Sequence, residues 1–222
     1  AWALLLCALL FSLRYVFEGL GNVMDPLYWM HKYAHAEGGL MASGTILIGH
    51  MLVSIFGEQL MPLRLVGWLC VVVAIVLPYC MLLDSQQRKT NILWLVIALM
   101  LMNYGAFQEF SPGTLTVLCL SALWCVFIRF QRTKKRVWLI ILGLLTGVSV
   151  VIRFPNILVL PIVLIALCML TDLPWLMRLR YMAWYILSVL IGAGVLYGIA
   201  WVVMTPAYMD AAMGSHQISS MI

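Results

Sequence analysis

Long apolar runs separated by short polar segments make up most of this chain. Such runs cover residues 63–83, 91–107, 113–130, 137–152, 156–170 and 182–204, and another opens the chain at residues 1–16. A helix needs roughly 17–25 apolar residues to cross a hydrocarbon core of about 30 Å. The pattern therefore predicts an all-α fold, a polytopic transmembrane helical bundle of about seven crossings, with residues 1–222 forming a single transmembrane domain.

The basic residues gather in alternate polar segments, which predicts the orientation of the bundle. Nine of the 13 Lys and Arg residues lie in or beside segments 84–90, 131–136 and 171–181: Arg88, Lys89, Arg129, Arg132, Lys134, Lys135, Arg136, Arg178 and Arg180. Short loops rich in Lys and Arg stay in the cytoplasm. Segments 108–112, 153–155 and 205–222 are therefore expected on the extracytoplasmic side, the last as the start of a further loop that is cut short.

The amino-acid composition is that of a membrane protein, and the distribution of charge bears on which partners it binds. Hydrophobic residues make up 65% of the sequence and charged residues 9%, whereas soluble domains are about half apolar and a quarter charged. The formal charge of +5 lies in short loops between apolar runs, so it does not indicate nucleic acid. Membrane lipids are expected partners of a bundle in the bilayer. Five glycines are expected to allow close helix packing, namely Gly143, Gly147, Gly192, Gly194 and Gly198.

The segment 39–56 is apolar but short, and it contains His50 and three glycines. Two arrangements satisfy the charge pattern. In the first, residues 18–61 form the first extracytoplasmic loop and residues 39–56 lie in the membrane interface, which leaves about seven crossings. In the second, residues 18–38 are cytoplasmic and residues 39–56 cross the membrane, which gives about eight.

Three stretches in a fixed order carry a resemblance to a known family. They are DPLYWMHKYAHAEGG at 25–39, then IFG at 55–57 with LRL at 63–65, and finally LGLLTG at 142–147 with IRFP at 152–155. This order resembles the polyprenyl-phosphate-sugar-dependent membrane glycosyltransferases with the GT-C fold. Within them it is most similar to the bacterial protein-mannosyltransferase-like and aminoarabinose-transferase-like group.

The resemblance implies the first arrangement, with an extracytoplasmic active site in a bacterial inner membrane. Asp25 matches the first acid of the family's acidic pair, although Pro26 stands where the pair has Glu. Glu109 stands where the family has a second outer-loop acid, usually Asp. The implied partners are a polyprenyl-phosphate sugar donor and a lipid, glycan or protein acceptor.

Sugar transfer from a lipid phosphate requires a base for the acceptor hydroxyl, and cations or a divalent metal for the departing phosphate. Asp25 is the candidate base, and Glu109 is the candidate for placing the acceptor or a metal. Arg64 and Arg153 each stand at the outer end of a predicted helix, where a guanidinium can bind phosphate in bidentate fashion. Lys32 is the third cation expected to bind substrate.

His31 and His35 are four residues apart and would share one helical face, so with Glu37 they form a candidate metal site. The competing interpretation is a solvated face of an interfacial helix. Structural interpretations also exist for the other candidates. Asp25 before Pro26 has the pattern of a helix N-cap, the two arginines could anchor helix ends at the headgroups, and Glu109 could end a helix.

The predicted function is an integral-membrane glycosyltransferase with Asp25 as general base. The alternatives are a transporter or flippase for a lipid-linked or small polar solute, and a non-catalytic scaffold. Ion-coupled transport usually needs an acid or lysine in the middle of a span, and the predicted spans have none. If replacing Asp25 with alanine left every phenotype intact, the scaffold would be favoured.

Overall fold

A computed structural model describes residues 7–10, 13, 24–36, 42–83, 85–101, 110–170 and 174–203, and every regular element in this part of the chain is helical. Residues 7–10 are helical, and the helices α2 (Met24–Ala34) and α3 (Ser43–Phe56) follow. They are followed by α4 (Leu60–Leu82), α5 (Ser85–Leu101), α6 (Pro112–Thr133) and α7 (Arg136–Ile152). The 3-10 helix η2 (Phe154–Leu158) leads into α8 (Val159–Cys168), which precedes α9 (Trp175–Val203).

The predicted all-α membrane bundle is confirmed by the positions of these helices. Each apolar run expected from residue 63 onward overlaps a helix. Residues 102–107 of the run at 91–107, and most of the run at 1–16, lie outside the described residues. In the described part, α4, α6 and α9 are long and apolar enough to cross a membrane, and α3, α7 and η2–α8 are apolar but shorter. The number of crossings and the interfacial place of residues 18–61 stay predictions.

The start of α9 differs from the sequence-based expectation, which placed residues 171–181 in a loop. The helix begins at Trp175, and the carbonyl of Pro174 accepts the first bonds, from the N–H groups of Met177 and Arg178. Leu, Met and Arg favour helix, so the helix continues through the basic segment beyond the end of the span. At 29 residues, α9 is about 43 Å long, which lets its first turns pass beyond a hydrocarbon core of about 30 Å.

The chain forms two compact units. Unit 1 contains residues 1–34 and 49–125, and unit 2 contains residues 35–48 and 126–222, so the boundaries fall at the end of α2, within α3 and within α6.

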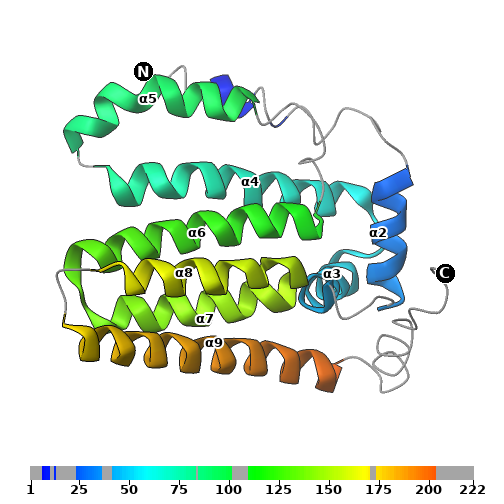
Figure 1. Ribbon diagram of the computed structural model, residues 1–222. Coiled ribbons are helices and arrows are strands. Elements are labelled where there is room, and N and C mark those ends of the chain that lie inside the picture. Colours follow the sequence, from blue (N-terminus) through cyan, green and yellow to red (C-terminus); the bar gives the residue numbers. More distant parts are fainter. Residues whose placement is uncertain are drawn as a thin grey trace, which may run out of the picture. The chain divides into compact units, whose positions relative to one another are not determined.

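Unit 1 is built on the antiparallel pair α4 and α5, which lie side by side in Figure 1. Their apolar faces enclose a buried cluster of Ala8, Val71, Leu95 and Leu99. The first half of α6 joins α4 through the Ser121 hydroxyl, which donates to the carbonyl of Ala74. The short helix α2 lies across the amino-terminal end of α4 (Figure 1).

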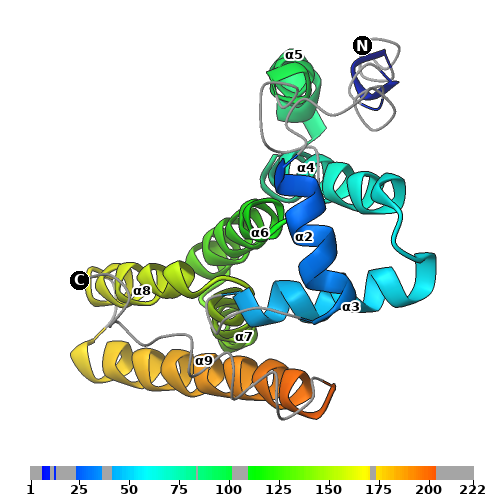
Figure 2. The same cartoon turned by 90° about the vertical axis from the view of Figure 1, so that its right-hand side faces the viewer.

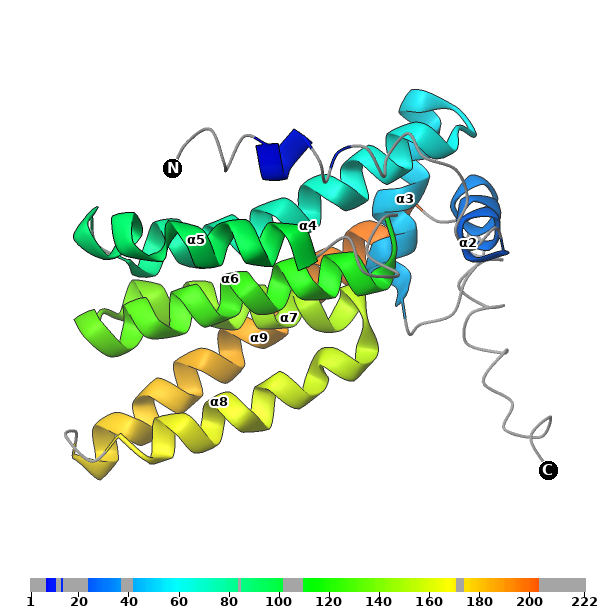
Figure 3. The same cartoon turned by 90° about the horizontal axis from the view of Figure 1, so that it is seen from above.

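Unit 2 is built on α7 and α9, which pack closely against each other in Figure 2. Inside this contact, the Tyr185 hydroxyl donates to the hydroxyl of Thr146 over 3.1 Å, and both side chains are fully buried. The helix α8 runs back from the end of α7, and it approaches α9 near its own carboxyl-terminal end, as Figure 3 shows.

Three of the five glycines expected to allow helix packing lie in the contact between α7 and α9. A Cβ at Gly143, Gly147 or Gly192 would overlap atoms of the opposite helix. Gly194 and Gly198 have nothing within 4 Å of such a Cβ among the described residues, so for these two the expectation stays a prediction. Both lie on α9, and small residues on a helix stripe do not by themselves say which face meets a partner.

Candidate functional site

The short helix α2 carries three of the predicted site residues: Asp25, His31 and Lys32. It begins at Met24, so Asp25 lies inside its first turn and not ahead of it as an N-cap. The backbone of Asp25 is described, and its side chain lies outside the description.

Tyr33 anchors α2 to the rest of unit 1. Its side chain is fully buried, and its hydroxyl donates to the carbonyl of Phe110 over 3.0 Å. The two rings meet edge to face with centroids 5.6 Å apart. The carbonyl of Tyr33 accepts a bond of 2.8 Å from Nδ1 of His50. Gly49 leaves the space that the Tyr33 ring occupies, because a Cβ there would overlap the ring.

Phe110 connects this anchor to the start of α4. Its N–H donates to the carbonyl of Leu63 over 3.1 Å, and Arg64 follows directly in the sequence. Phe110 also follows Glu109 directly, although Glu109 itself lies outside the described residues. The contacts of Tyr33 and Phe110 therefore bring together the helix of Asp25, the helix of Arg64 and the residue beside Glu109.

The position of Phe110 is stabilised by the start of α6. The hydroxyl of Thr114 accepts a bond of 3.0 Å from the N–H of Ser111, and the hydroxyl of Ser111 accepts one of 3.4 Å from the N–H of Thr114. This reciprocal arrangement is a capping box with Thr in the second position. Pro112 is the first residue of the helix, where its missing N–H costs nothing.

His31 and Lys32 lie in the last turn of α2, and His35 follows the helix in a turn. Both histidines are exposed, whereas Lys32 is half-buried and lies over aromatic rings. Its Nζ is 4.4 Å from the ring centroid of Tyr28 and 5.8 Å from that of Trp29. The cation is thus held on a small aromatic surface.

The expected metal site is not assembled by the described residues. No group of three or more His, Cys, Asp and Glu that could hold a metal occurs among them. His31 and His35 supply two ligands at most, and Glu37 lies outside the described residues.

Arg64 and Arg153 are both at helix ends, as expected from the sequence, but they belong to different units. Arg64 is half-buried in the second turn of α4, and Arg153 is exposed where α7 ends. The main chain of Arg153 is held at both ends, because its N–H donates to Ser149 and its carbonyl accepts from Asn156. Its guanidinium thus extends from a rigid corner.

Polar side chains reinforce this corner. The amide nitrogen of Asn156 donates to both the carbonyl and the hydroxyl of Ser149, over 3.0 and 2.9 Å. The Thr45 hydroxyl, on α3, donates to the carbonyl of Ile152 over 2.9 Å. Gly44 lets α3 approach this closely, since a Cβ there would lie 3.0 Å from the nitrogen of Ile152.

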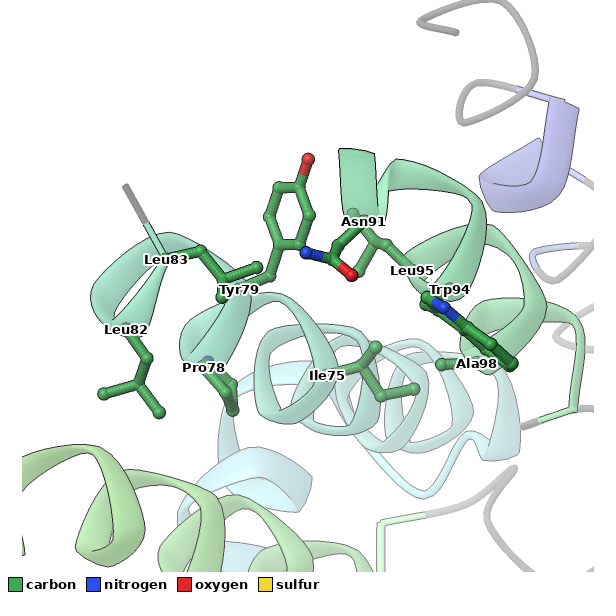
Figure 4. Close-up of a pocket in the computed structure, with 9 residues that line it drawn as sticks. All are labelled: Ile75, Pro78, Tyr79, Leu82, Leu83, Asn91, Trp94, Leu95 and Ala98. Atoms are coloured by element: carbon green, nitrogen blue, oxygen red, sulfur yellow. The ribbon is translucent and has the colours of Figure 1, made fainter. Parts of the chain in front are cut away.

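A separate apolar groove of about 370 Å³ lies between α4 and α5, with Ile75, Pro78, Tyr79, Asn91 and Trp94 in its lining (Figure 4). The Asn91 amide donates to the carbonyl of Gln87 over 2.9 Å. None of the residues that line the groove carries a charge. It therefore lacks the base and the phosphate-binding cations that sugar transfer requires.

Sequence reasoning assigned no role to Tyr33 or Phe110. A tyrosine within a run of aromatic residues gives no local sign of burial. The bond to Phe110 joins positions 77 residues apart, which no periodicity within one segment can indicate.

One comparison with known proteins gives a match. The family model described as dolichyl-phosphate-mannose-protein mannosyltransferase matches residues 45–201. This span includes Arg64, Glu109 and Arg153, whereas Asp25 and the rest of α2 precede it. No curated protein and no solved structure matches the chain.

Proposed function

The chain belongs to the dolichyl-phosphate-mannose-protein mannosyltransferase family, and from this premise we propose that it transfers a sugar from a polyprenyl-phosphate carrier to an acceptor on the extracytoplasmic face of the membrane. The family match is the observation that carries the proposal. It favours the enzyme over the transporter and scaffold alternatives.

The proposed reaction is a displacement at the anomeric carbon. The bond from this carbon to the phosphate oxygen breaks, and a bond to the acceptor oxygen forms. The acceptor hydroxyl gives its proton to a carboxylate, which the proposal assigns to Asp25. The phosphate leaves with an additional negative charge, so cations around it stabilise the transition state.

The cations in this proposal are Arg64, Arg153 and Lys32. A guanidinium presents two parallel N–H groups to a phosphate, which suits the exposed Arg153 at its rigid corner. Lys32 contributes a point charge from the last turn of α2. Glu109 is proposed to orient the acceptor.

The network around Tyr33 supports the grouping of Asp25, Glu109 and Arg64. Tyr33 and Phe110 tie α2 to the residue next to Glu109, and Phe110 is bonded to the residue next to Arg64. A site assembled on rigid helix ends holds reacting groups in place.

The test compares Asp25→Asn with Glu58→Gln in membranes that contain the full chain. Glu58 is an exposed acid between α3 and α4 in the same unit, so it is a matched control. With labelled polyprenyl-phosphate mannose as donor, Asp25→Asn is expected to lower transfer into membrane lipid and protein by roughly 100- to 10,000-fold. Full transfer by Asp25→Asn would remove the base assignment, whereas no transfer by the unsubstituted chain would remove the proposed activity.

A further inference from the structure

One end of unit 2 carries a dense group of cations, which we call the polybasic end. Its members are Arg129, Arg132, Lys134, Lys135, Arg136, Arg178 and Arg180. The described part of unit 2 contains no Asp or Glu. The sequence adds Asp172, outside the described residues, which lowers the formal charge of this end from +7 to +6.

Two segments far apart in the sequence meet at this end. The buried Tyr181 near the start of α9 donates its hydroxyl proton to the carbonyl of Lys134 over 3.2 Å. Its ring meets Phe130 edge to face, with centroids 5.6 Å apart. The turn between α6 and α7 and the first turns of α9 therefore hold their cations next to each other.

The turn itself is tight. Lys134 has a φ of 52°, a left-handed conformation that is uncommon for residues other than glycine. Its N–H donates to the carbonyl of Phe130 over 2.7 Å, which closes the end of α6. The chain then starts α7 at Arg136, so three consecutive cations occupy the turn.

A second contact brings α8 to the same end. Arg178 donates from Nη1 to the carbonyl of Cys168, the last residue of α8, over 2.9 Å. A cation at this position interacts favourably with the negative end of the helix dipole. Met182 contacts the Cys168 sulfur over 3.5 Å, which also holds the two helices together.

The described part of unit 2 supplies no carboxylate to neutralise the charge at this end. Within the described residues, the Nε of Arg129 is buried and has no hydrogen-bond partner, which is costly for a charged group. An anion bound beside this guanidinium would offset the cost through its field.

Apolar side chains lie directly beside the cations. Met169 is 73% exposed, Leu176 78% and Trp175 59%. Cations next to apolar helix surface match a molecule with an anionic headgroup and hydrocarbon chains. Trp at such a boundary is typical of the membrane interface.

We propose that the polybasic end of unit 2 binds anionic glycerophospholipids, with the headgroup phosphates on its lysines and arginines and the acyl chains along the adjoining ends of α8 and α9. The lipid belongs to the cytoplasmic leaflet, because these cations mark the predicted cytoplasmic side. The inference is independent of the sugar-transfer proposal.

The test is a titration of the full chain in a zwitterionic detergent with fluorescent phosphatidylglycerol, followed by anisotropy. Fluorescent phosphatidylcholine serves as the zwitterionic reference. The double variant Lys135→Gln/Arg136→Gln is expected to raise the dissociation constant for phosphatidylglycerol at least about fivefold. Salt at about 1 M, which shortens the Debye length to about 3 Å, is expected to weaken binding further.

The matched control is Arg88→Gln/Lys89→Gln, which removes the same charge from another predicted cytoplasmic segment, in unit 1. It is expected to change the constant by less than about twofold. Equal effects of the two pairs, or no effect of either, would overturn the proposal. If the first pair fails to give a monodisperse protein, Lys134→Gln/Arg180→Gln replaces it, with the same expected result.

Discussion

At the residue scale, the buried Tyr33 joins α2 to Phe110 within unit 1, so the stability of this unit is expected to depend on it. Tyr33→Phe keeps the ring in place but leaves the carbonyl of Phe110 without its donor. A buried acceptor without a partner costs about 1–3 kcal/mol, so the thermal midpoint of the purified chain is expected to fall.

The control for this prediction is Tyr28→Phe on the same helix. Tyr28 is 52% exposed, so losing its hydroxyl is expected to leave the midpoint nearly unchanged. Equal midpoints for the two variants would show that the bond from Tyr33 to Phe110 contributes nothing to stability.

Two glycines on α9 give a second prediction at this scale. A Cβ at Gly192 would overlap the carbonyl of Leu144 on α7, whereas one at Gly194 meets nothing within 4 Å. Gly192→Ala is expected to destabilise the chain by about 1–3 kcal/mol through overpacking. Gly194→Ala is expected to be neutral or to stabilise by up to about 1 kcal/mol, because alanine favours helix. Chemical denaturation in detergent measures both, and a reversed order would contradict the observed face of α9.

At the scale of elements, Asn156 is one of the polar side chains that hold the corner between α7 and η2. Asn156 is buried and bonds twice to Ser149, so Asn156→Ala removes both bonds at once. We expect a loss of about 1–3 kcal/mol and a lower affinity for the sugar donor, because the corner carries Arg153.

Asn91→Ala is the comparison for this prediction. Asn91 makes one exposed bond within α5, and its loss is expected to change stability by less than about 0.5 kcal/mol. If both variants lose the same free energy of unfolding, the bonds of Asn156 contribute no more to stability than the exposed bond of Asn91. Loss of stability in Asn156→Ala with unchanged donor affinity would separate the fold of the corner from its proposed role.

At the scale of the whole molecule, the sidedness of α2 decides between the two arrangements of the chain. His31→Cys and Lys135→Cys are placed singly in a chain whose six native cysteines are replaced. Both positions are exposed, so a membrane-impermeant thiol reagent can reach them. We expect labelling at position 31 in intact cells, and labelling at position 135 only after permeabilisation.

The opposite result at position 31 would have a clear meaning. It would favour the arrangement with about eight crossings and place Asp25 on the other side of the membrane from Glu109 and Arg153. The proposed base would then be excluded, while family membership and the polybasic end would stand.

The sequence by itself determined the class of the molecule and the positions of most helices. Apolar runs of the right length are a local property, so α4, α6 and α7 could be placed within a few residues. The family resemblance also rested on short local motifs, and the family match confirmed it. The start of α9 was missed because a basic segment signals the end of a span in the membrane, not the end of a helix.

Only the tertiary structure decided which side chains meet. Tyr33 bonds to a residue 77 positions away and Tyr181 to one 47 positions away, and neither stands out in its own segment. Likewise, of the glycines on α9, Gly192 packs against α7, whereas a Cβ at Gly194 or Gly198 meets no atom of the described residues within 4 Å. The physical reason is that hydropathy and charge are properties of each local segment, so the sequence shows them directly. Close packing and buried hydrogen bonds depend on partners from distant segments, which only folding brings together.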